Sequence, residues 1–112
     1  MDLITLRKII FSLFLENTYF FLADAGKLCS DHSSTVIRKD QCRESLATIK
    51  KTYSDAVDGI DFNHSWPGRP KGCFLHLKNA NLHWNPDSTG RSNIENRQVC
   101  EIKYRKGINK FE

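Results

Sequence analysis

The chain has 112 residues, which is room for one domain. Hydrophobic residues make up 39% of the sequence and charged residues 27%, a composition that excludes wholesale disorder. The formal net charge of +4 is compatible with anionic membranes, acidic glycans or nucleic acid, and it selects none of them.

The first 25 residues are predicted to be a secretory signal peptide. The pair Arg7–Lys8 supplies a short positive region, and the apolar run Ile9–Leu15 follows it. The tripeptide Ala23–Ala25 has the small-x-small pattern of a cleavage site. Glu16 interrupts the apolar stretch, which leaves a buried N-terminal helix as the alternative and disfavours a membrane span of about 20 residues. Cleavage after Ala25 would leave a single mature domain, residues 26–112.

All four cysteines lie in the predicted mature domain, at Cys29, Cys42, Cys73 and Cys100. An even number of cysteines in a short exported chain indicates two disulfides and an extracellular location. Crosslinks also make physical sense, because a domain of this size buries little apolar surface. No cysteine then remains as a catalytic nucleophile.

A short extended segment is predicted at Thr35–Ile37, and a helix is expected after it. Asp40 is a favourable N-cap residue. Residues that can share one helical face follow it: Cys42, Leu46, Ile49 and Tyr53. Such a face normally packs on the core, so we assign no ligand role to it.

The segment Trp66–Gly72 is rich in proline and glycine. Pro67 and Pro70 restrict the backbone and bias the residues before them toward extended geometry. Gly72 permits a close approach of the chain immediately before Cys73. We expect this segment to carry Cys73 sharply onto the helix.

Strands are predicted at Gly72–Leu77, Leu82–Trp84 and Gln98–Tyr104, with a turn at Lys78–Asn81. One main helix packed on a small antiparallel sheet is an α+β fold.

Four cysteines permit three disulfide pairings. A Cys42–Cys73 bond would join the helix to the sheet, and a Cys29–Cys100 bond would tie the two ends of the domain. We favour this arrangement over the alternatives, among them Cys29–Cys42 with Cys73–Cys100, which would leave the helix unattached to the sheet.

Several short motifs occur in order: Trp66-Pro67, Lys71–Phe74, Leu82–Asn85, Ser88–Gly90 and Val99-Cys100. Together they resemble uncharacterised small secreted modules with an aromatic-Pro-x-Gly-Cys-aromatic segment, a V-Y-F-N-like strand and a closing cysteine. Two departures are the longer proline segment, at Gly68–Pro70, and the sequence of the second strand. The cysteine layout is also remotely similar to that of the PAN or apple modules. The resemblance implies a fold and no particular activity.

The predicted binding residues combine aromatic, basic and amide side chains: Trp66, Arg69, Lys71, Trp84 and Asn85. If exposed, such a set is suited to recognising a glycan or a protein. The alternative, which we favour for the tryptophans, places both in the core.

His76 and His83, with Lys71, are the residues to test for acid–base hydrolysis, as in a small ribonuclease. No zinc motif of the His-Glu-x-x-His or paired Cys-x-x-Cys type occurs, so we expect no metal site and no cofactor. Asn63-His64-Ser65 is a sequon for N-glycosylation of Asn63 in an expected surface loop.

The sequence therefore predicts a secreted, non-enzymatic binding or structural module whose partner is an extracellular glycan or protein. The first alternative is a cationic effector of the antimicrobial or toxin type that acts on anionic membranes. A small secreted hydrolase is the second alternative, and nucleic acid is not an expected partner.

Overall fold

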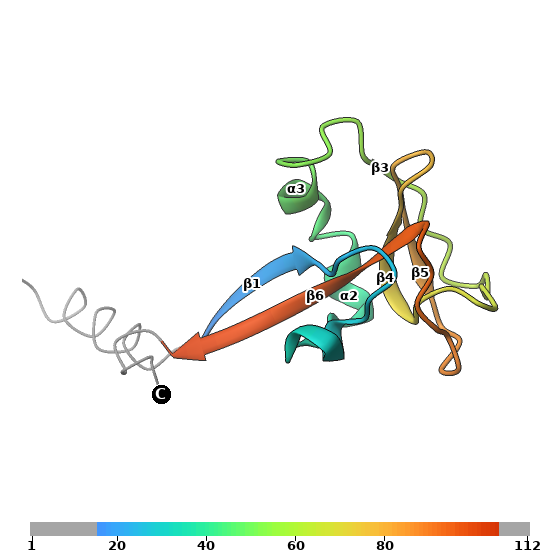
Figure 1. The fold of residues 1–112 in the computed structure, drawn as a ribbon. Coiled ribbons are helices and arrows are strands. Elements are labelled where there is room, and N and C mark those ends of the chain that lie inside the picture. Colours follow the sequence, from blue (N-terminus) through green and yellow to red (C-terminus); the bar gives the residue numbers. More distant parts are fainter. Residues whose placement is uncertain (1–15, 106–112) are drawn as a thin grey trace, which may run out of the picture. The chain divides into compact units, whose positions relative to one another are not determined.

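The computed structural model describes residues 16–105 (Figure 1). Arg7–Lys8 and Ile9–Leu15, which carry the signal-peptide prediction, lie outside the described residues. The chain divides into two compact units, and the segment Phe20–Glu101 forms the larger one. Residues 16–19 and 102–105 belong to the other unit and consist of strand.

The described elements follow one another in this order: β1 (Glu16–Leu22), η1 (Cys29–His32), β2 (Thr35–Val36), α2 (Lys39–Cys42), α3 (Leu46–Ile49), β3 (Val57–Asp58), β4 (Gly72–His76), β5 (Asn81–Asn85) and β6 (Asn96–Arg105). The η1 element is a single 3-10 turn. None of the described helices is long and apolar enough to cross a membrane.

The strands form one sheet in the order β1-β6-β4-β5-β3, and β2 pairs with the middle of β6, at Cys100 and Glu101 (Figure 1). The pairs of β4 with β5, β4 with β6 and β2 with β6 are antiparallel, and β3 joins β5 in parallel. The predicted α+β class is confirmed. The three predicted strands correspond to β4, β5 and β6, whereas β1 and β3 were not predicted.

The helical segment differs from the predicted single helix because it is interrupted between α2 and α3. It begins one residue before Asp40, with Arg38 as the N-cap residue, and Gln41 accepts the Arg38 backbone N–H at 2.9 Å. The buried Ser45 hydroxyl donates to the Cys42 carbonyl at 2.7 Å. This side-chain bond competes with regular helical bonding, and a tighter turn joins the two short helices.

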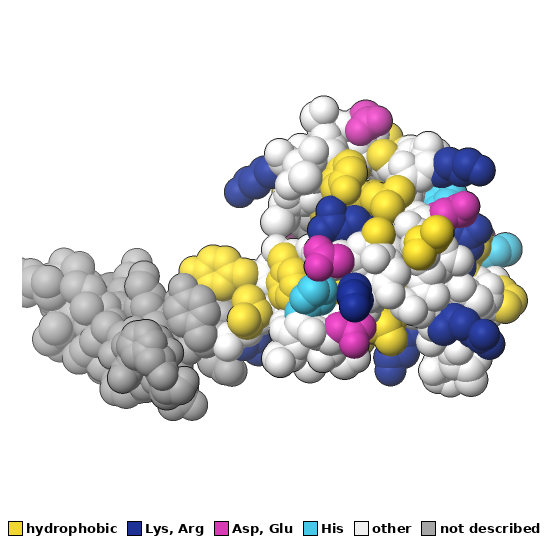
Figure 2. All heavy atoms as spheres, in the orientation of Figure 1, with side chains coloured by type: hydrophobic (Ala, Val, Ile, Leu, Met, Phe, Trp, Pro, Cys, Tyr) yellow, Lys and Arg dark blue, Asp and Glu magenta, His cyan; other side chains and the backbone are white. Residues whose placement is uncertain are grey.

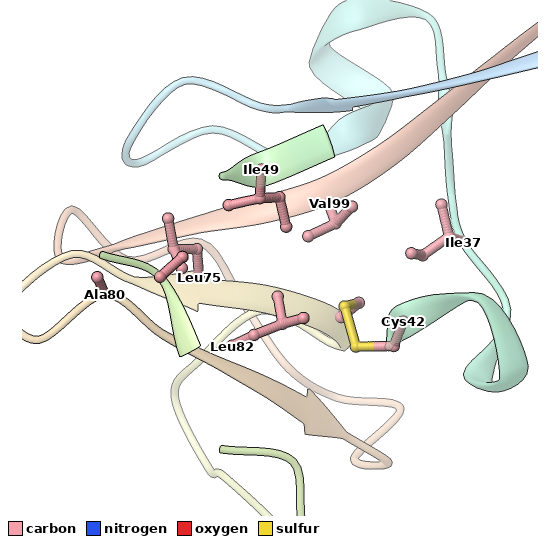
Figure 3. Packing of buried hydrophobic residues seen from close by; sticks show 9 residues of the cluster. Ile37, Cys42, Ile49, Leu75, Ala80, Leu82 and Val99 are labelled. Atoms are coloured by element: carbon pink, nitrogen blue, oxygen red, sulfur yellow. A yellow bond between two sulfur atoms is a disulfide. The ribbon is translucent and has the colours of Figure 1, made fainter. Parts of the chain in front are cut away.

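The main core lies between the helical segment and one face of the sheet (Figure 3). Ile49 of α3 and Cys42 of α2 point toward Leu75 and Leu82, which are paired across β4 and β5. Val99 of β6 completes this layer and is fully buried. Alternation along the strands explains the layer, since every second side chain of β4 and β6 faces the helices.

The opposite face of the sheet carries Phe74 together with polar side chains. Asn96 and Gln98 on β6 are buried there, opposite His76 and Phe74 of β4. Further along the same face of β6, the buried Cys100 packs with Cys29. This polar face is where the chain departs most from a simple hydrophobic core.

The structure contains the two disulfides favoured from the sequence, Cys42–Cys73 and Cys29–Cys100. Cys42 and Cys73 are bonded with their Cα atoms 5.4 Å apart, and this bond joins α2 to β4. Cys29 and Cys100 are bonded with their Cα atoms 5.5 Å apart, which ties η1 to β6. The proline-rich segment therefore delivers Cys73 to the helix as expected.

The end of β1 is built into the larger unit. The backbone N–H of Ala23 donates to the Gln98 carbonyl at 2.8 Å, and Ala23 is fully buried. Arg97 donates to the carbonyls of Ala23 and Leu22 at 2.8 and 3.2 Å. Cleavage after Ala25 would remove this strand; the signal peptide itself stays a prediction.

Candidate ligand-binding site

The buried Asn85 organises the proline-rich loop from within. Its Oδ1 accepts the Trp66 N–H at 2.9 Å, and its Nδ2 lies within hydrogen-bond distance of the carbonyls of Trp66, Arg69 and Pro70. Only 1% of Asn85 is exposed. Among the predicted binding residues, Asn85 therefore supports the loop from below, and its amide is occupied by the protein itself.

The two tryptophans lie on opposite faces of the sheet. Trp84 is paired with Cys73 across the strands, so it shares the face of the helices and packs against the main core. Trp66 packs on the other face, with its ring 6.0 Å from Phe74 and 4.6 Å from His83. Both rings are partly buried. Because they lie on opposite faces, the predicted binding patch is divided between the two faces of the sheet.

A hollow of about 430 Å³ lies between the η1–β2 segment and the start of β4. This volume lies in the range of small-molecule sites. Its lining is rich in hydroxyl groups and includes Ser30, Ser34, Thr35, Val36, Lys71 and Ser88. Hydroxyl groups both donate and accept hydrogen bonds, as a polyhydroxylated ligand requires.

A second hollow of about 210 Å³ shares Val36, Lys71 and Ser88 with the first. Trp84 and Asn85 also line it. We call the two hollows together the Lys71 groove, because Lys71 borders both. The groove brings Lys71, Trp84 and Asn85 together, whereas Trp66 and Arg69 line neither hollow.

Gln98 holds the two walls of the Lys71 groove at a fixed separation. Its Oε1 accepts the Cys29 backbone N–H at 2.7 Å, and its Nε2 donates to the Lys71 carbonyl at 2.8 Å. Only 2% of Gln98 is exposed. Sequence reasoning missed this residue, although a glutamine in the alternating pattern of a strand is a signal that a buried side chain must find polar partners.

The loop that carries Ser88 and Gly90 forms a third wall of the groove, and Gly90 lets this loop pack closely on the backbone beside Lys71. A Cβ atom at this position would lie 2.8 Å from the Lys71 backbone nitrogen, closer than packing permits. The neighbouring Arg91 N–H donates to the Arg69 carbonyl at 3.0 Å. The loop that carries Ser88 is thereby fastened to the backbone beside Lys71.

Lys71 is the one charged side chain among the described residues that line the Lys71 groove. Lys71 is exposed, and no carboxylate is among the side chains that line either hollow. The ammonium group is free to donate up to three hydrogen bonds. The groove can therefore receive hydroxyl, carboxylate or sulfate oxygens beside a partly buried aromatic ring.

A second cluster of polar groups lies under Trp66. Arg69 Nη1 is 3.1 Å from both Asn96 Oδ1 and His76 Nδ1, and those two atoms are themselves 3.1 Å apart. The Arg69 guanidinium also lies 5.5 Å from the centre of the Trp66 ring. Trp66 and Arg69 are thus brought together, but away from the groove.

The histidines proposed for acid–base hydrolysis share this face, with ring centres 6.4 Å apart. Burial lowers the pKa of His83 below its ordinary value, and positive charge at His76, Arg69 and His64 lowers it further, although a hydrogen bond with the Gly59 backbone opposes the shift. His83 Nδ1 is buried and has no partner among the described residues. Its imidazole is accordingly neutral over a wider pH range than a solvated one.

Asn63 is exposed in the loop between β3 and β4, where the sequon was expected to lie. Its glycosylation remains a prediction. Within residues 16–105, no group of three or more His, Cys, Asp or Glu side chains is placed to hold a metal ion.

No protein-family model, curated protein or solved structure matches this chain.

Proposed function

We propose that this protein is an extracellular, non-enzymatic module that binds a glycan in the Lys71 groove. The observation that carries the proposal is that two hollows share Val36, Lys71 and Ser88 in their lining, and that Trp84 lines the smaller one. A hydroxyl-rich wall, one cation and an aromatic side chain are the groups that recognise hydroxyls, acidic substituents and the apolar face of a sugar ring.

The two disulfides support the extracellular part of the proposal. They indicate an oxidising environment, since disulfides persist there and are rare in reducing compartments. Export by an N-terminal signal peptide is the route we propose. Collecting the protein from culture medium and sequencing its N-terminus tests that route, and retention of uncleaved chains in the cell would contradict it.

A glycan array probed with the oxidised full-length protein tests the binding function. We expect saturable binding to one glycan class. Lys71→Glu reverses the groove charge and Ser88→Trp fills the wall shared by both hollows, so each should weaken binding at least about tenfold.

Lys78→Glu and Ser92→Trp are the matched controls, because both residues are exposed and neither lines a hollow. Both controls should bind as the unmodified chain does. Binding that is lost equally in groove and control variants, or that is absent from the whole array, would contradict the proposal.

The other two functions are tested with the same protein. On the face drawn in Figure 2, Lys and Arg side chains are dispersed among acidic and hydrophobic ones, which gives a cationic effector no concentrated patch there. Binding to anionic vesicles at low salt that vanishes at high salt would favour the effector. RNA turnover that is lost in His76→Ala or His83→Ala would favour the hydrolase.

A further inference from the structure

We propose that Arg69, His76 and Asn96 form an oxyanion-binding site, separate from the Lys71 groove, that takes a sulfate or carboxylate group. Hydrogen bonds of 3.1 Å from Arg69 Nη1 and from His76 Nδ1 to Asn96 Oδ1 hold the three side chains together on the polar face of the sheet. The Asn96 oxygen has two lone pairs and can accept from Arg69 and from His76 at once. In that arrangement the proton of His76 lies on Nδ1.

Asn96 has a donor that the protein does not use. The residue is fully buried, and its Nδ2 has no hydrogen-bond partner among the described residues. Its oxygen contacts Arg69 and His76, so the amide nitrogen lies at the same cluster. A buried amide N–H without an acceptor is rare, because the group has lost its hydrogen bonds to water and gained none in the protein, which costs free energy. An oxyanion would supply the missing acceptor.

Arg69 adds further unused donors and a positive charge. Only its Nη1 has partners among the described residues, which leaves Nε and Nη2 available. No ion pair joins Arg69 to a carboxylate within residues 16–105. A guanidinium presents parallel donors that match the oxygens of carboxylate or sulfate, and such bonds are stronger than neutral ones.

The surroundings of Arg69 favour an anion over a neutral ligand. The Trp66 ring holds the guanidinium by a cation–π contact, and His64 packs on the same ring with its centre 4.3 Å away. The positive charge of Arg69 also contributes to the lowered pKa of His83, which has burial as its main cause. An oxyanion would offset this charge.

NMR titration of the oxidised full-length protein tests the site, with sodium sulfate in one arm and sodium glucuronate in the other. Sodium chloride keeps the ionic strength constant. We expect the side-chain amide signals of Asn96 and the ring signals of His76 to shift saturably in at least one arm. The preferred arm then tells whether the group is a sulfate or the carboxylate of an acidic sugar.

Two variants and one control make the result decisive. Arg69→Gln should raise the dissociation constant at least about tenfold, because the charge-assisted donors are lost. Asn96→Asp keeps the side-chain shape beside Arg69 but removes the Nδ2 donor, and it should also abolish binding. Arg91→Gln removes a nearby exposed charge and should bind as before.

Unchanged affinity in Arg69→Gln, or shifts that do not saturate with either anion, would overturn the proposal. Failure of the groove variants to alter glycan binding would not affect it, since Arg69, His76 and Asn96 line neither hollow of the groove.

Discussion

At the scale of single residues, the buried Asn85 is the main support of the Trp66–Pro70 loop. It was predicted from the sequence as part of a binding patch, and it lies beneath the loop that holds Trp66 and Arg69. Backbone groups of an irregular loop lack the regular partners that neighbouring strands give one another, and the Asn85 amide supplies hydrogen bonds to several of them. The backbone beside Arg69 therefore depends on a side chain whose amide is occupied by the protein itself.

Asn85→Ala should lower the free energy of unfolding by about 2 kcal/mol or more, because several backbone groups of the Trp66–Pro70 segment would lose their partner. Chemical denaturation followed by tryptophan fluorescence measures the change. Asn81→Ala, in the same strand and only partly buried, is the control and should cost much less. Equal losses of unfolding free energy in the two variants would show that the hydrogen bonds of Asn85 add no stability beyond that of a partly buried asparagine.

His83 predicts a pH dependence of stability. Its pKa in the folded chain lies below the ordinary value of 6.5, chiefly because burial disfavours the charged ring. The unfolded chain therefore binds the proton more readily, and the stabilisation that His83 provides is present above pH 6.5 and is lost as the pH falls below it. His83→Gln should flatten this part of the profile of unfolding free energy against pH. His64→Gln, at an exposed position, is the comparison, and identical profiles for His83→Gln and the unmodified chain would contradict the assignment.

At the scale of elements, β1 is the strand that sequence reasoning did not foresee. Its end is held by Arg97, which also donates to the Tyr53 hydroxyl at 2.9 Å. A chain that begins at Gly26 lacks the strand and leaves these donors with fewer partners. Its free energy of unfolding should be lower by about 3 kcal/mol or more than that of a chain that begins at Glu16. Matching denaturation curves for the two chains would show that β1 adds no stability.

The disulfide between α2 and β4 is the crosslink between the two layers of the fold. Replacing Cys42 and Cys73 by alanine together should cost about 3–4 kcal/mol, since the unfolded chain regains the freedom of the closed loop. The pair Cys29 and Cys100 closes a longer loop, with a separation of 71 residues against 31, and should cost slightly more. Thermal denaturation of the two double variants measures both losses. A loss below about 1 kcal/mol in either variant would contradict the crosslinking role.

At the scale of the whole molecule, the predictable features were those with local signatures. The strand around Cys73 follows from its apolar run, and the helical face with Cys42 follows from periodicity. Their meeting follows from the turn chemistry of the loop before Cys73. The break between α2 and α3 was not predictable, because Ser45 ends the first helix by a side-chain bond that periodicity does not reveal.

The candidate sites were only partly predictable for a related reason. Lys71 and Trp84 were named because of their chemistry, and the structure places them in one groove. Trp66 was assigned to the same patch, but a strand sends alternate side chains to opposite faces, and the contacts of Trp66 lie on the other one. Ser34 and Ser88 come from distant loops and carry no local signal that they share a wall. Long-range pairing, which no single segment encodes, brings them together.

The measurement that tests the central claim most directly is a map of backbone amide shifts in the oxidised protein, titrated with the glycan that the array identifies. Binding in the Lys71 groove predicts saturable shifts concentrated at Ser34, Thr35, Lys71 and Ser88. Lys50 and Lys51, in the turn after α3, should be unaffected. Shifts concentrated outside the groove residues, with Ser34, Lys71 and Ser88 unchanged at saturation, would contradict the account.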